Sequence, residues 1–154
     1  MLFRSGGTPC LSPTHALPRF APLKNTRPPA RSPRSFADIK RTKNIDFVPR
    51  FWQVIATNPV QLELVWTSLK SLMHPESVGR VARLDPMTRE LIALAVSATN
   101  GCPYCINSHT AALRKLGVDP ETLGELMAIV GLFNMTNALA NGYQIEPDVR
   151  PPRD

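Results

Sequence analysis

Helix-start signals, each followed by apolar residues at helical spacing, dominate the chain after about residue 45. The pairs Asn58-Pro59, Asp85-Pro86 and Asp119-Pro120 each place a capping side chain directly before a proline. Proline is tolerated in the first helical turn because its missing N–H would have no partner there, so each pair predicts a helix start. After the first pair, apolar residues recur in steps of three and four: Leu62, Val65, Trp66, Leu69, Leu72 and Met73. Such a stripe is typical of a helix with one buried face.

The same signals divide the rest of the chain into helices. The predicted helices cover residues 47–57, 59–74, 86–100, 103–116, 120–130 and 131–142. The third is apolar almost all round over Leu91–Val96, so we expect it to be the most buried. No alternating β-branched run of strand length competes. A chain of 154 residues suffices for one ordinary core. We therefore predict an all-α fold: a single helical-bundle domain of about six helices over residues 45–145, with a C-terminal tail over 146–154.

The N-terminal region has a different composition. Residues 1–37 contain seven of the 16 prolines and six basic side chains, with no Asp or Glu. We expect a disordered, basic, Pro/Arg/Ser-rich tail over residues 1–44, with no role for Cys10. An organelle transit peptide has a similar composition, but so much proline disfavours the amphipathic helix of such peptides. We favour a solvated extension and a cytoplasmic location.

Charge and composition exclude several function classes. The net charge of +6 comes from the tail, because the remaining residues hold 12 basic and 12 acidic groups. A cationic face for nucleic acid is therefore not expected. The longest clean apolar run has six residues, against about 20 for a membrane span, so no membrane contact is expected. Three cysteines are too few for a disulfide framework, which favours a reducing compartment. No Gly-rich phosphate loop is present, so we expect no flavin or nicotinamide cofactor.

The residue types that carry chemistry gather in residues 101–109, which read Gly-Cys-Pro-Tyr-Cys-Ile-Asn-Ser-His. Cys102 is in the cap position of the predicted helix. Cys105 and His109 follow it by three and seven residues, so all three lie on the same face of that helix. A helix N-terminus lowers a cysteine pKa from about 8.5 to between about 3.5 and 7.5. Two cysteines with this spacing can also close a disulfide, so oxidation of one is resolved by the other. The pattern indicates dithiol redox chemistry.

Glu90 lies twelve residues before Cys102, on the preceding predicted helix. If the two helices form a hairpin about Gly101, the residue opposite Glu90 falls near 111 or 112, within a turn of His109. We therefore predict a proton relay from Glu90 through His109 to the cysteines.

The residues around this motif carry a resemblance to a known family. The segments Arg89–Leu94, Gly101–Cys105, His109–Ala112 and Lys115–Val118 closely resemble the alkylhydroperoxidase D-like branch of the carboxymuconolactone decarboxylase superfamily. The resemblance implies an all-helical homo-oligomer, commonly a trimer or hexamer, that reduces hydroperoxides or exchanges electrons with thiol partners. It also implies that Cys105 attacks the peroxide, that Cys102 resolves the sulfenic acid, and that Glu90 and His109 relay protons. A dithiol protein or a small thiol then supplies the electrons.

Several alternatives stay open. Helix-terminus electrostatics favour Cys102 as the attacking sulfur, whereas the resemblance favours Cys105. Tyr104 replaces the histidine that some peroxidase members have between the cysteines, and a phenol transfers protons poorly at neutral pH. This favours dithiol exchange over strong peroxidase activity. A glutaredoxin-type fold would need a strand before the motif. The remaining rivals are a carboxymuconolactone decarboxylase-like enzyme and a zinc-stabilised helical oligomerisation module, with Glu90 or His74 as a fourth ligand.

Overall fold

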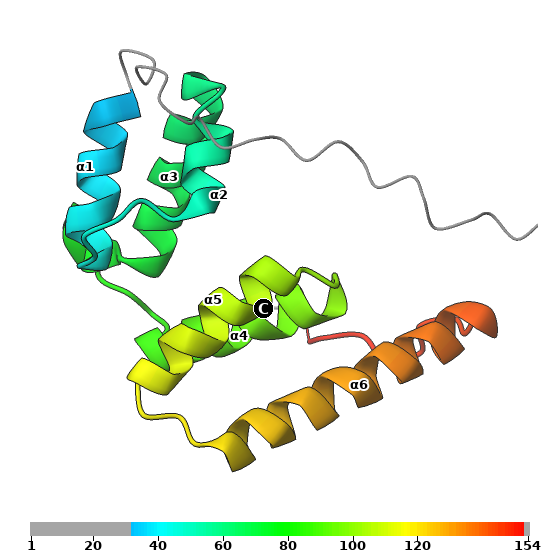
Figure 1. Cartoon of the computed structure of the whole chain (residues 1–154). Helices are drawn as coiled ribbons and strands as arrows, with labels where there is room; N and C mark the ends of the chain where they lie inside the picture. Colours follow the sequence, from blue (N-terminus) through cyan, green and yellow to red (C-terminus); the bar gives the residue numbers. More distant parts are fainter. Residues whose placement is uncertain (1–31, 153–154) are drawn as a thin grey trace, which may run out of the picture. The chain divides into compact units, whose positions relative to one another are not determined.

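The computed structural model describes residues 32–152, and within that range it contains helices and no strand (Figure 1). The helices are α1 (Ser32–Lys43), α2 (Arg50–Ile55), α3 (Pro59–Met73), α4 (Pro86–Thr99), α5 (Pro103–Lys115) and α6 (Pro120–Gly142), with a 3-10 turn, η1, over Pro75–Val78. The predicted all-α class with about six helices is confirmed.

The described helices form two compact units, which divide between Arg80 and Val81. The expected single domain over residues 45–145 thus divides at Arg80, because helices α4–α6 pack among themselves. Helices α1–α3 belong to the first unit, in which α1 and α2 each contact α3. The predicted C-terminal tail starts close to the end of α6, and residues 146–152 have no regular secondary structure.

The prediction of a disordered tail over residues 1–44 is wrong for residues 32–43, which form α1. Phe36 and Ile39 are three residues apart and face the core of the first unit, where Ile39 is fully buried. Three basic residues occupy the last turn of α1, where the helix dipole favours cations. Residues 1–31, which include Cys10 and most of the segment compared with a transit peptide, lie outside the described residues.

The core of the first unit is built around two indole rings. Trp52 and Trp66 meet edge to face with ring centroids 5.2 Å apart, and both are buried. The Trp66 Nε1–H donates to Asp38 Oδ2 at 2.8 Å, and Lys70 Nζ donates to both carboxylate oxygens of Asp38, at 2.9 and 3.0 Å. Burial raises the pKa of Asp38, but the hydrogen bonds from Lys70 and Trp66 and the charges of Lys70 and Arg41 outweigh it, so the net shift is downward.

The second unit is a helical hairpin, α4–α5, with α6 packed along α4 (Figure 1). Its buried hydrophobic residues are Leu94, Leu113 and Val118. Helix α4 has the most buried residues of the three helices in this unit, Leu94 and Ser97, but it is not buried all round, because Ile92 and Val96 are 49% and 54% exposed. The apolar residues of α4 surround the helix, but its neighbours within the unit leave one side uncovered.

Helix α6 joins two segments that were expected to be separate helices, residues 120–130 and 131–142. Gly131 lies within this continuous helix and does not interrupt it. Among residues 32–152, α6 alone is long and apolar enough to cross a membrane, although its longest clean apolar run is short. Length and composition by themselves are weak evidence for a membrane span.

Candidate functional site

The turn between α4 and α5 places Cys102 by backbone hydrogen bonds. Gly101 has a positive φ of 63°, which glycine adopts without steric cost. Its N–H donates to the Ala98 carbonyl at 3.2 Å, and the Cys102 N–H donates to the Ser97 carbonyl at 3.0 Å. This pair of bonds is the Schellman motif that ends many helices. Cys102 is also the N-cap of α5, with Pro103 next to it, so one residue closes the first helix and starts the second.

The two cysteines of the motif lie together at the N-terminus of α5. The Cys105 backbone N–H donates to Cys102 Sγ at 3.3 Å, so the sulfur acts as the capping acceptor. The structure joins Cys102 and Cys105 as a disulfide, with their Cα atoms 5.4 Å apart. That separation is within the usual range for a disulfide, about 4.4 to 6.8 Å. Both residues are partly exposed, so a small reagent can reach the pair.

Glu90 and His109 meet across the hairpin. Glu90 Oε2 lies 2.7 Å from His109 Nδ1, and the two side chains are 18% and 25% exposed. The hairpin geometry predicts a residue near 111 or 112 opposite Glu90, and the observed partner lies within one turn of that position. His109 follows Cys105 by one helical turn on α5, so the structure brings the four predicted site residues to one hairpin.

The contact with Glu90 orients the imidazole. A carboxylate only accepts hydrogen bonds, so a neutral His109 that bonds to it carries its proton on Nδ1. The other ring nitrogen, Nε2, then has the lone pair that accepts a proton. A carboxylate–imidazole pair of this kind is suited to moving protons to and from a neighbouring reacting group.

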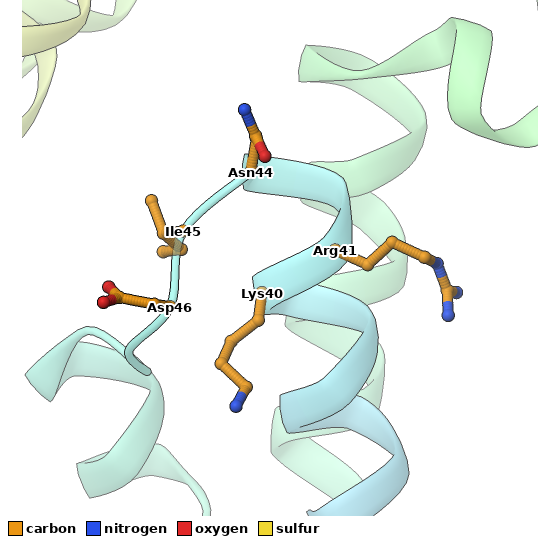
Figure 2. A pocket seen from close by; sticks show the side chains of 5 residues that line it. All are labelled: Lys40, Arg41, Asn44, Ile45 and Asp46. Carbon is orange, nitrogen blue, oxygen red and sulfur yellow. The ribbon is translucent and has the colours of Figure 1, made fainter.

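Other predicted or conspicuous features form no comparable site. Among residues 32–152 no three His, Cys, Asp or Glu side chains form a group suited to a metal ion, so the zinc ligand set drawn from Glu90 or His74 is not assembled. An open hollow lies at the C-terminal end of α1, lined by Lys40, Arg41, Asn44, Ile45 and Asp46 (Figure 2). Its two basic side chains point in different directions, and Arg41 pairs with Asp38.

Comparison with known proteins agrees with this geometry. The carboxymuconolactone decarboxylase family matches residues 75–145, which include all four predicted site residues. The crystal structure of the alkylhydroperoxidase AhpD core from Rhodospirillum rubrum superposes with a TM-score of 0.68 at 44% identity, covering 77% of this chain and 83% of that chain. The chain belongs to the alkylhydroperoxidase D-like branch of the carboxymuconolactone decarboxylase superfamily.

Curated relatives match over shorter stretches. The alkyl hydroperoxide reductase AhpD of Streptomyces griseus is 51% identical over 44 residues, which is 29% of this chain and 25% of that protein. The AhpD of Maricaulis maris is 46% identical over 57 residues, 37% of this chain and 31% of that protein. YdfG of Bacillus subtilis, an uncharacterized protein, is 38% identical over 55 residues, 36% and 37% of the two chains. The chain thus spans 25% to 37% of the length of these relatives.

Proposed function

We propose that this alkylhydroperoxidase D-like protein is a thiol-dependent peroxidase and disulfide reductase. The observation that carries the proposal is the pairing of Cys102 with Cys105 at a helix N-terminus, in the same hairpin as the hydrogen bond between Glu90 and His109. The names of the AhpD relatives support the same reaction class. The pair cycles between a dithiol and a disulfide, and no cofactor takes part.

In the oxidative half of the cycle, the Cys105 thiolate attacks the terminal oxygen of a hydroperoxide. The S–O bond forms as the O–O bond breaks, and the leaving alkoxide takes a proton from the relay to become an alcohol. Cys105 is then a sulfenic acid. The Cys102 thiolate attacks its sulfur, the disulfide forms, and the hydroxyl leaves as water. His109, oriented by Glu90, accepts and returns the protons of these steps.

The position of Cys105 supports its assignment as the attacking sulfur. Cys105 lies in the first turn of α5, four residues before His109, so the relay is one helical turn away. Cys102 caps the helix, and its sulfur already accepts the Cys105 N–H. The same bond stabilises a Cys102 thiolate, which suits a resolving nucleophile. Two cysteine variants distinguish this order from the reverse one.

In the reductive half, a partner dithiol protein or a small thiol attacks the Cys102–Cys105 disulfide and restores both thiols. We further propose that the protein acts in the cytoplasm as a homo-oligomer, a trimer or a hexamer, without nucleic-acid or membrane contacts. Tyr104, 45% exposed between the two cysteines, shapes access to the pair.

The test is a thiol count before and after a pulse of organic hydroperoxide on the fully reduced protein. We expect a loss of two thiols per chain that dithiothreitol reverses. Cys105→Ser abolishes the fast loss, whereas Cys102→Ser stops at a sulfenic acid that dimedone traps. Trapping in Cys105→Ser instead reverses the roles of the two sulfurs. Unchanged thiols in the wild-type protein contradict the proposal.

The family's name favours carboxymuconolactone decarboxylation as a second candidate. That activity does not need a cysteine pair, so it survives in the Cys102→Ser/Cys105→Ser double variant if it is the true function. The zinc-stabilised helical module has no observation in its favour, because its ligand set is not assembled among residues 32–152. Elemental analysis of the purified protein decides it, because about one bound zinc per chain and unfolding by a chelator contradict the redox cycle.

A further inference from the structure

The last turn of α4 holds the backbone groups that position Cys102. The Cys102 N–H donates to the Ser97 carbonyl, and the Gly101 N–H donates to the Ala98 carbonyl. Both carbonyls belong to the final turn of α4, which ends at Thr99. A displacement of this turn therefore moves the Cys102 sulfur with it.

Packing within the unit weakens toward this end of α4. The last buried residue of the helix is Ser97, and residues 99–101 are exposed. Val96, in the same turn, is 54% exposed. Helix ends fray, because their last carbonyl groups have no partner within the helix. A side-chain contact at Thr99 is therefore placed where it limits fraying.

Asn134 of α6 makes such a contact. Its Nδ2 donates to Thr99 Oγ1 at 3.1 Å and to the Val130 carbonyl, one turn earlier in α6, at 2.8 Å. An amide nitrogen carries two hydrogens, so each acceptor takes one. The bond to Val130 fixes the amide on its own helix and directs the other hydrogen at Thr99. Leu123 and Leu126 pack against the core of the unit from the same helix. Helix α6 thus presents a fixed donor to the end of α4.

We propose that Asn134 is a positioning residue for Cys102. Its bond to Thr99 holds the end of α4, and the turn that follows keeps the Cys102 sulfur within reach of Cys105. Asn134 acts through the backbone of this turn. The inference rests on the proposed function, in which Cys102 closes the disulfide, and adds the residue that holds this cysteine in place. Position matters here because it sets the effective concentration of one reacting group at the other.

The step that depends on this position is disulfide closure. The Cys102 thiolate attacks the sulfur of the Cys105 sulfenic acid, the S–S bond forms as the S–O bond breaks, and the hydroxyl leaves as water with a proton from the relay. The earlier attack of Cys105 on the hydroperoxide does not involve Cys102. Loosening the end of α4 should therefore slow the second step and leave the first unchanged, which a general loss of stability does not do.

Two pairs of variants of the full, reduced chain test the role of the contact. Thr99→Val removes the accepting hydroxyl at nearly constant volume, whereas Thr99→Ser keeps it. Asn134→Ala removes the donor, and Asn137→Ala truncates another exposed amide of α6 as the matched control. Rapid mixing with cumene hydroperoxide, followed by dimedone trapping and mass spectrometry, gives the rates of sulfenic acid formation and of disulfide closure.

We expect Thr99→Val and Asn134→Ala each to slow closure about fivefold, the scale of one lost hydrogen bond, with sulfenic acid formation unchanged. Thr99→Ser and Asn137→Ala should react like the wild type. The double variant Thr99→Val/Asn134→Ala should be no slower than either single variant, because both remove the same bond. Urea unfolding followed by circular dichroism verifies that each variant folds.

An equilibrium measurement keeps the test independent of the hydroperoxide. In glutathione buffers of graded redox ratio, the oxidised fraction of the protein gives the equilibrium constant of the Cys102–Cys105 disulfide. We expect this constant to fall about fivefold in Asn134→Ala and to stay unchanged in Asn137→Ala.

A wild-type closure rate in Asn134→Ala and Thr99→Val overturns the inference. So does an equal slowing in Asn137→Ala or Thr99→Ser, or a loss of stability in Asn134→Ala with both steps at the wild-type rate. A wild-type protein that loses no thiols to hydroperoxide contradicts the proposed function instead. The glutathione equilibrium then decides the role of Asn134, and an unchanged constant in Asn134→Ala overturns it.

Discussion

The unit of helices α1–α3 buries two tryptophans, whereas the unit of helices α4–α6 buries no aromatic side chain among its described residues. In the first unit, the half-buried carboxylate of Asp38 has an indole, an ammonium and a guanidinium as partners. In the second, the partly buried carboxylate of Glu90 contacts the imidazole of His109, which follows the cysteine pair by one turn of α5. The first cluster lies within a core, and the second is the one for which we propose a role in proton transfer. The comparison also shows that apolar composition does not predict burial, because the apolar helix α6 is left exposed.

The largest expected effect is on the first unit. Trp66→Ala removes a buried ring from its contact with Trp52 and removes the indole donor to Asp38. We expect it to lower the free energy of unfolding by about 4 kcal/mol, as large-to-small core substitutions do. Urea unfolding followed by circular dichroism measures the loss. Phe51→Ala, at a ring that is 40% exposed, is the control with a smaller loss. Equal losses in the two variants show that the tryptophan pair does not hold the unit together.

The second prediction separates chemistry from stability in the other unit. Glu90→Gln keeps a hydrogen-bond acceptor beside His109 but removes the charge that stabilises the imidazolium. We expect hydroperoxide-dependent thiol loss to slow about 100-fold, the usual scale of general acid–base catalysis, with little change in unfolding. Stopped-flow thiol titration measures the rate. Glu125→Gln, at an exposed position on α6, is expected to react like the wild type. A normal rate in Glu90→Gln removes the relay from the mechanism.

The third prediction concerns the charge at Asp38. Asp38→Asn leaves Lys70 without its carboxylate partner, so we expect a loss of about 2 kcal/mol at pH 7. The pKa of Asp38 is held below its ordinary value of 3.8, so its contribution is complete above that pH. It is lost as the pH falls through the lower folded-state pKa. Thermal unfolding of both proteins at pH 7 and pH 3 should therefore show the difference shrinking in acid. A difference that is the same at both pH values means that the charge does not contribute.

Local signals explain which parts of this structure could be predicted. The Asx-Pro pairs gave the first residue of α3, α4 and α6, because capping and the missing proline N–H act within one turn. The hairpin contact of Glu90 with His109 followed from equal distances to the turn at Gly101. Helix α1 was missed because its place in the core depends on distant contacts. Asp38 contacts Trp66 and Lys70, which lie 28 and 32 positions later in the chain. The exposure of α4 and α6 was missed for a related reason, since a sequence shows apolar faces but not which of them meet.

The smallest expected effect contrasts a neutral and a charged helix cap, one in each unit. Asn58 Oδ1 accepts the N–H groups of Val60 and Gln61, and Asn58→Ala should cost about 1 kcal/mol at any pH. Asp85 accepts the Thr88 hydroxyl and N–H instead, and these hydrogen bonds lower its pKa, the one from the hydroxyl most. Asp85→Ala should therefore lower the melting temperature at pH 7 and lower it less at pH 3, where the wild-type carboxylate starts to be protonated and loses its stabilising charge. Melting curves of the two variants at both pH values give the contrast. A pH-independent loss in Asp85→Ala shows that the cap acts through its hydrogen bonds alone, without a contribution from its charge at the positive end of α4.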